Sequence, residues 1–203
     1  ISLGLVGSEM CIRDSSMTVI QNSSLTLETF LKQPESKPAK EYIDGDIIEK
    51  HISKARHSRL QAKLIYHINE VAEKSKLAYA FPELRCTFGG RSTIPDIAVL
   101  YWENIEVDEK VEPKDNILIA PNWTIEILSP EQSSNRVTNN ILHCLKYGCQ
   151  LGWLLDPDDR SILVFQPEKQ PEFCHRNDSL LILDGIDLTL TVEQVFDWLK
   201  MKL

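Results

Sequence analysis

Two short apolar segments each carry one acidic residue, and these acids are the residues best suited to chemistry. The segments are Thr93-Ile94-Pro95-Asp96-Ile97-Ala98-Val99-Leu100 and Trp123-Thr124-Ile125-Glu126-Ile127-Leu128-Ser129-Pro130. Their β-branched residues predict buried strands. A carboxylate in a buried strand is costly to desolvate unless a cation or hydrogen bonds compensate it. Asp96 and Glu126 therefore suggest a divalent cation between adjacent strands, with oxygen ligands suited to Mg²⁺ or Mn²⁺.

A structural alternative exists for both acids. Each carboxylate would then lie in water at the end of its strand, or cap the turn that follows. Pro95 precedes the first acid, and Ser129-Pro130 closes the second segment. The residues alone leave the metal site and the structural alternative open.

The strongest helical pattern runs from about Ser53 to Lys74. At 100° per residue, His57 and Gln61 share the face that carries the apolar side chains. These apolar residues are Leu60, Leu64, Ile68 and Val71. His57 is therefore expected to point towards the sheet and the acid-bearing strands, although a histidine on an apolar face is commonly a hydrogen-bonded core residue. The opposite face carries Arg56, Arg59 and Lys63, which suit solvent or contact with phosphates.

The remaining elements complete an α/β or α+β arrangement, with helices flanking a mixed central sheet. The Asp44-Gly45 pair predicts a tight hairpin over residues 41–49, with Glu41 at its mouth. Residues 102–122 are expected to form an irregular surface loop. Further helices are expected at 25–31, 136–147 and 191–199, strands at 79–81, 83–88, 152–157 and 161–165, and a late hairpin at 172–175 and 180–183.

Composition is that of an ordinary globular protein, with 42% hydrophobic and 26% charged residues in a chain of 203. The net charge of −8 argues against a protein that coats nucleic acid through bulk charge, although a local basic patch stays open. Five cysteines without a CxxC pair suggest reduced thiols in a cytoplasmic protein, and zinc is not expected. No apolar run is long enough to span a membrane.

Residues 1–16, ISLGLVGSEMCIRDSS, do not have the pattern of a signal peptide. They look like the translated adaptor sequence found at the ends of some metagenomic sequences. We therefore expect a non-native extension over residues 1–16 and a single endonuclease-like domain over residues 17–203, starting at Met17.

The order of elements, with an acid after proline in one central strand and Glu-x-hydrophobic in the next, resembles the PD-(D/E)XK nuclease fold. More closely, the chain resembles the Uma-two family of restriction-endonuclease-like proteins, which is abundant in cyanobacteria. The matching pieces, which together cover nearly everything from about residue 25 to the end, are Glu41-Tyr-Ile-Asp-Gly45, His57, Pro95-Asp96-Ile-Ala-Val, Thr124-Ile-Glu126-Ile-Leu-Ser-Pro130 and Gly148-x3-Gly152-Trp-Leu-Leu-Asp-Pro157. The resemblance implies a restriction endonuclease-like core, a mixed central β-sheet flanked by helices, with an N-terminal helix and hairpin.

The resemblance also implies a role for each site residue. In this fold the proline-linked acid and the following Glu bind Mg²⁺, which activates water and stabilises the charge on a cleaved phosphodiester. Carried over, Asp96 and Glu126 are the metal ligands. Glu41 and His57 are further site residues, either as a third carboxylate or as a pair that orients ligands and transfers protons.

The chain departs from the nuclease pattern at one residue type. The lysine that orients the attacking water stands two residues after the Glu in classical members, where this chain has Leu128. Many family members have a lysine in the next helix, at a position that corresponds to Asn140 here. Lys146 is more than a turn further along, and Arg85 or Gln61 would be other occupants of that space. Metal binding therefore follows from the match more directly than catalysis does.

Three hypotheses remain for function. The first is a Mg²⁺-dependent endonuclease that hydrolyses phosphodiester bonds in DNA through the two carboxylates. The second is a catalytically degenerate nuclease-fold module that binds nucleic acid or a protein partner without cleavage. The third is a homo-oligomer, such as a homodimer, whose late hairpin pairs edge to edge.

Overall fold

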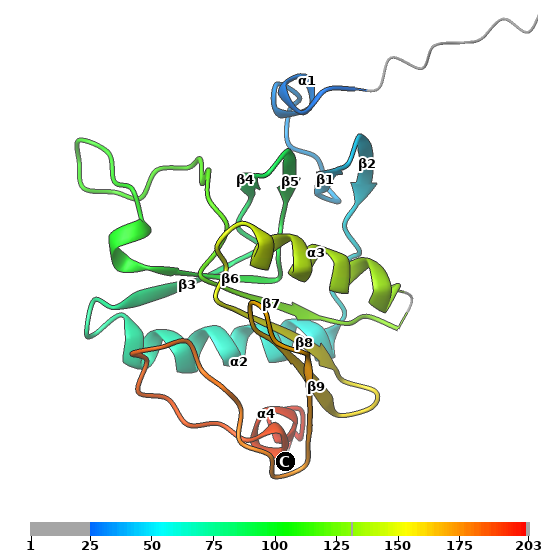
Figure 1. The fold of residues 1–203 in the computed structure, drawn as a ribbon, viewed down its shortest axis with the longest axis vertical. Coiled ribbons are helices and arrows are strands. Elements are labelled where there is room, and N and C mark those ends of the chain that lie inside the picture. The colour runs from blue at the N-terminus through cyan, green and yellow to red at the C-terminus, as the bar shows by residue number, and fades with distance from the viewer. Residues whose placement is uncertain (1–24, 131, 202–203) are drawn as a thin grey trace, which may run out of the picture.

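The computed structural model describes residues 25–130 and 132–201 (Figure 1). The expected boundary at residue 16 lies outside these residues. The helices are α1 (Leu27–Leu31), α2 (Ala55–Ala72), α3 (Ser134–Lys146) and α4 (Val192–Asp197), with a 3₁₀ turn η1 at Trp102–Asn104. The strands are β1 (Lys40–Ile43), β2 (Asp46–Glu49), β3 (Ala78–Pro82), β4 (Cys86–Phe88), β5 (Arg91–Thr93), β6 (Ile97–Tyr101), β7 (Trp123–Ile127), β8 (Leu151–Asp156), β9 (Ser161–Phe165) and β10 (Glu172–His175).

Two sheets organise these strands. The larger has the order β10-β9-β8-β7-β6-β3, and the smaller has the order β2-β1-β5-β4. β7 and β8 are parallel, while the other pairs are antiparallel. A parallel pair needs a crossover connection, and α3 supplies it. The fold is a mixed central sheet flanked by helices, which confirms the predicted fold class.

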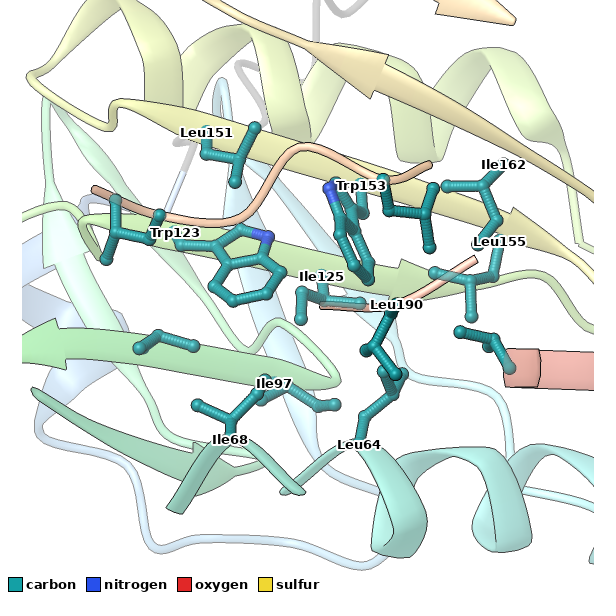
Figure 2. Close-up of a cluster of buried hydrophobic side chains, with 14 of the residues drawn as sticks. Leu64, Ile68, Ile97, Trp123, Ile125, Leu151, Trp153, Leu155, Ile162 and Leu190 are labelled. Atoms are coloured by element: carbon teal, nitrogen blue, oxygen red, sulfur yellow. The ribbon is translucent and has the colours of Figure 1, made fainter. Parts of the chain in front are cut away.

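Strand alternation sends side chains into two cores on opposite faces of the large sheet. Ile97 and Val99 of β6 pack with α2, whereas Ala98 and Leu100 pack with Cys144 of α3. Successive side chains of a strand point to opposite faces, so a strand covered on both sides is apolar throughout. Figure 2 shows the α2 side, where Leu64 and Ile68 of the helix and side chains of β6, β7 and β8 converge on one cluster. Glu126 lies between Ile125 and Ile127, so it faces α3.

The sequence suggested that Thr93–Leu100 forms one strand, but the structure divides this segment. It divides into β5 in the small sheet and β6 in the large sheet, and residues 94–96 connect them. Pro95 has no N–H to donate to a ladder, which accounts for the break at this position. Asp96 therefore lies where the chain passes from one sheet to the other.

The prediction of a hairpin between residues 172–175 and 180–183 is wrong. β10 pairs with β9, and residues 180–183 are irregular. Leu180 and Leu183 are buried in the core on the α2 side, so their contribution is burial instead of strand pairing. The expected hairpin is thus absent, and β10 alone forms that outer edge of the large sheet.

The β3 edge of the large sheet is closed by a side chain from α2. Asn69 donates through Nδ2 to the carbonyl of Ala80 at 3.0 Å and accepts from the Ala80 N–H at 2.8 Å. Pro82, at the end of β3, has no N–H to offer. These features leave little unpaired backbone for another strand to join.

Other elements agree with the sequence patterns. Gly148 has a φ of +104° where α3 ends, as expected of a C-terminal glycine. Residues 105–122 are irregular apart from isolated bridges. No helix among the described residues has the length and apolarity needed to cross a bilayer.

Three of the cysteines share one buried cluster beneath α3. Cys86, Cys144 and Cys149 pack in the core with Ala98 and Leu100, and all three are free thiols. Burial raises the pKa of Cys86 and of Cys149 to about 12. Thiols this hard to ionise are poor nucleophiles and behave as small apolar side chains.

Candidate functional site

Asp96 is the centre of the polar cluster between the two sheets. Lys50 Nζ donates to its Oδ1 at 2.7 Å, and His57 Nε2 lies 2.9 Å from its Oδ2. The backbone N–H of Ile127 donates to Oδ2 at 2.8 Å. Burial opposes ionisation of Asp96, but the charge of Lys50 and the contact with His57 outweigh burial and lower its pKa to about 2. The carboxylate is therefore charged and fixed in one orientation.

Glu126 lies beside Asp96 in the neighbouring strand, on the face covered by α3. It is buried, and the backbone N–H of Asp96 donates to its carboxylate. Burial and the negative charge of Asp96 raise the pKa of Glu126 well above its usual value, although Lys50 opposes them. No ion pair to the Glu126 side chain is present in the described part of the chain. Glu126 therefore sits where additional positive charge would be favourable.

Glu41 and His57 reach the same cluster from different elements, β1 and α2. Glu41, in β1, accepts a hydrogen bond from the N–H of Ile94 at 2.6 Å, two residues before Asp96. Burial raises the pKa of Glu41, partly offset by this hydrogen bond and by Lys50. His57 is the third residue of α2, and its Nδ1 is buried without a hydrogen-bond partner. The structure thus brings all four predicted site residues together.

A narrow crevice of about 30 Å³ opens at this cluster. Glu41, Lys50, Glu126 and Asn140 line it, together with Arg136 at the start of α3. A broader hollow of about 390 Å³ adjoins it, shares Glu49, Lys50 and His51 with it, and is also lined by Ile52 and Ser129. The crevice has room for about one water molecule, and the hollow gives access to it.

Lys50 is the residue of this cluster that sequence reasoning missed. It directly follows β2, and its side chain is 13% exposed. It reaches Asp96 and the carbonyl of Ile94 across 46 and 44 residues of sequence. Burial and the nearby carboxylates decide its state: burial disfavours its ammonium, but Asp96 and Glu126 raise its pKa above the usual lysine value. The sequence offered no signal for Lys50 beyond its place after the predicted hairpin.

The other residues considered for the missing lysine do not fill that role. Gln61 donates to the backbone oxygen of Asp96 at 2.8 Å and does not contact the carboxylate. Arg85 is bound to Glu35 in a two-pronged ion pair. Lys146 lies over the ring of Tyr147 on the exposed side of α3. Asn140 lines the crevice, and its Oδ1 is buried without a partner.

The basic face of α2 is largely used within the fold. Arg56 donates to Asp158 at 2.7 Å and to the carbonyl of Pro157, and Arg59 donates to the carbonyl of Trp198. These contacts fasten α2 to the β8–β9 turn and to the C-terminal region. Arg56 stays exposed, as expected of a solvated face, while Arg59 is half-buried against the C-terminal region.

The geometry described above can be compared with known proteins. The sequence profile of the Uma2 family, described as "Putative restriction endonuclease", matches residues 27–193. The chain belongs to the Uma2 family. It is also similar to the crystal structure of "a putative nuclease belonging to DUF820" from Anabaena variabilis, with 47% sequence identity and a TM-score of 0.83. That match covers 86% of this chain and 99% of the Anabaena chain. A search of curated proteins finds no match.

Proposed function

We propose that this Uma2 protein is a Mg²⁺-dependent endonuclease that hydrolyses phosphodiester bonds in DNA, with Mn²⁺ as a substitute ion. The observation that carries the proposal is the pair of buried carboxylates, Asp96 and Glu126, side by side in a nuclease-like fold, with Glu126 lining a crevice beside them. Among the described residues Glu126 is buried without an ion pair, which is unfavourable for folding, and acids perturbed in this way are concentrated at functional sites.

The residues present fit a magnesium ion held by two carboxylates. In the described part of the chain, no group of three or more histidine, cysteine or acidic side chains is arranged to hold a metal. Mg²⁺ commonly uses only one or two protein carboxylates and keeps several waters. Carboxylate oxygens are also the hard ligands that it prefers. Asp96 and Glu126 would hold the ion, which when bound would activate water and offset charge on the phosphate.

The surrounding residues would position these ligands. The N–H of Ile127 and His57 Nε2 fix Oδ2 of Asp96, and the N–H of Asp96 holds Glu126. Glu41 fixes the backbone just before Asp96 through Ile94. Hydrolysis adds one water across the phosphodiester: its oxygen bonds to phosphorus, one phosphorus–oxygen ester bond breaks, and a proton ends on the leaving oxygen. Glu41 or His57 would take a proton from the attacking water.

A second candidate function is a nuclease-fold module that binds nucleic acid or a protein without cutting it. Two observations favour this alternative. Leu128 and Asn140 stand at both positions where a motif lysine is expected. Arg56 and Arg59 are engaged within the fold, which leaves less free positive charge for phosphates on a chain of net charge −8.

A cleavage assay separates the two functions. Supercoiled plasmid and single-stranded DNA would be incubated with the protein in Mg²⁺, in Mn²⁺ and in EDTA. We expect metal-dependent cleavage by the parent and by Glu109→Gln, a matched control at an exposed acid, and at least a hundredfold slower cleavage by Glu126→Gln. Retained cleavage in Glu126→Gln would contradict the two-carboxylate site. DNA binding without cleavage by the parent would favour the second function.

A further inference from the structure

Lys50 occupies an unusual position for a lysine. Its ammonium is largely buried, with 13% of the side chain exposed, and it contacts Oδ1 of Asp96 and the carbonyl of Ile94. It comes from the small sheet, whereas Glu126 comes from the large one. Burying an ammonium is costly unless it is paired and hydrogen-bonded. This lysine is therefore held in place by specific contacts at the point where the sheets meet.

Lys50 lines both the crevice that holds Glu126 and the broader hollow beside it, from which a phosphate would approach. Glu41, Glu126 and Asn140 form other parts of the same lining. Asp96 Oδ1 faces Lys50, while its Oδ2 is occupied by His57 and by the Ile127 N–H. Asp96 thus contacts Lys50 through Oδ1 and His57 through Oδ2. A positive group on this side lies next to the atoms that would bind the ion and the attacking water.

We propose that Lys50 is the positioning residue of the nuclease centre, supplied from the position after β2 in place of a lysine on β7 or α3. This inference rests on the proposed nuclease function. Lys50 fixes Oδ1 of Asp96, and in the working centre its ammonium orients the attacking water and offsets negative charge on the phosphate. The proposed role of Lys50 is electrostatic, and Lys50 transfers no proton in it. The motif strand is then free to carry an apolar residue at Leu128, which packs against the core beneath α3.

Asn140 gives the proposal an internal test. Its amide lines the same crevice from α3, and its Oδ1 accepts no hydrogen bond, so replacing that oxygen deprives no donor of a partner. A lysine at residue 140 would bring an ammonium to the crevice from α3. If the site requires a cation at the crevice, and not Lys50 itself, this second lysine should restore the cleavage rate that is lost when Lys50 is replaced.

The experiment compares five proteins: the parent, Lys50→Met, Lys50→Gln, Asn140→Lys and the double variant Lys50→Met/Asn140→Lys. Each is assayed for Mg²⁺-dependent plasmid cleavage, for Mn²⁺ affinity by calorimetry and for Tm. Lys50→Gln keeps a hydrogen-bond donor for Asp96, so the test remains available if Lys50→Met does not fold. We expect both single Lys50 variants to lose about a hundredfold in kcat with KM changed less than threefold. Mn²⁺ affinity is expected to stay or to rise, because a competing ammonium has left Asp96.

Restoration completes the prediction. The double variant is expected to recover at least tenfold in kcat over Lys50→Met. Parental kcat in both Lys50 variants would overturn the role of Lys50 while leaving the proposed nuclease function intact. Loss of both cleavage and Mn²⁺ binding in the Lys50 variants would also overturn it, because Lys50 would then only stabilise the fold. A parent that never cleaves DNA in Mg²⁺ or Mn²⁺ would instead overturn the proposed function, and this inference with it.

Discussion

Replacing Asp96 by Asn should destabilise the protein because it leaves a buried ammonium without its main counter-charge. The side chains of Lys50 and Asp96 are 13% and 5% exposed, so water can do little to compensate. Removing one partner of a buried ion pair costs about 3–5 kcal/mol. For a domain of this size each kcal/mol corresponds to roughly 2–4 °C in Tm, so the midpoint should fall by about 10 °C. Asn keeps the shape and one acceptor oxygen, but its NH₂ would face a donor, either Lys50 or the Ile127 N–H, so the loss would combine the missing charge with one missing hydrogen bond.

A double-mutant cycle tests this reasoning. Urea unfolding would be measured at pH 7 in EDTA for the parent, Asp96→Asn, Lys50→Met and the variant with both changes. The double variant should recover most of the loss, because neither charge is then left buried alone. A cost below about 1 kcal/mol for Asp96→Asn, or a double variant whose loss equals the sum of the two single losses, would refute the buried pair as an energetic unit.

Three further predictions concern other parts of the molecule. The pKa of Glu126 is raised above 4.5 in the folded state, so the metal-free parent protein should lose stability as the pH rises past that value. Glu126→Gln should lose less stability over the same pH range and should be at least as stable as the parent at pH 7 in urea titrations. A Glu126→Gln protein clearly less stable than the parent at pH 7 would contradict the raised pKa. Gly152→Ala should cost about 1–3 kcal/mol by thermal unfolding, because its Cβ would lie 2.4 Å from Ile141 Cγ2, and an unchanged Tm would contradict this packing of α3 on β8. Cys86 and Cys149 should resist a chromogenic disulfide reagent at pH 8 until urea unfolds the protein, since burial raises both pKa values to about 12; rapid reaction of both in the native protein would contradict their burial.

Local pattern was enough to predict most of the fold. The 3.6-residue periodicity of α2 placed Leu60, Leu64 and Ile68 in the core and His57 on the same face, as observed. The apolar runs of β6 and β7 identified buried strands, and β8 and β9 were also expected to be strands. The late hairpin failed because Leu180 and Leu183 have strand-like composition but are buried as irregular chain, and only tertiary packing decides between the two.

The two acids of the candidate site, Asp96 and Glu126, could be predicted from the sequence, whereas Lys50 could not. Asp96 and Glu126 stood out because acids in apolar runs are rare, and a single segment was enough to notice each one. Lys50 meets Asp96 only because two sheets join at residues 94–96, which brings together positions 46 residues apart. No local periodicity encodes such a contact. A lysine after a hairpin looks like any exposed lysine until the topology is known.

The choice of variant also follows from the structure. Asp96 supports Lys50, His57 and the N–H of Ile127, so its replacement changes stability and any metal binding together. Glu126 carries fewer contacts and is held at an energetic cost, so Glu126→Gln should leave the fold intact. Glu126 is therefore the cleaner position at which to ask whether the pair of carboxylates binds a metal.

Calorimetric titration of Mn²⁺ into the parent and into Glu126→Gln tests the central claim most directly. The account predicts one saturable site in the parent, and at least a tenfold loss of affinity in Glu126→Gln at unchanged Tm. The exposed-site variant Glu109→Gln should bind like the parent. Equal affinity in the parent and in Glu126→Gln, or no saturable binding in the parent, would contradict a metal centre at Asp96 and Glu126.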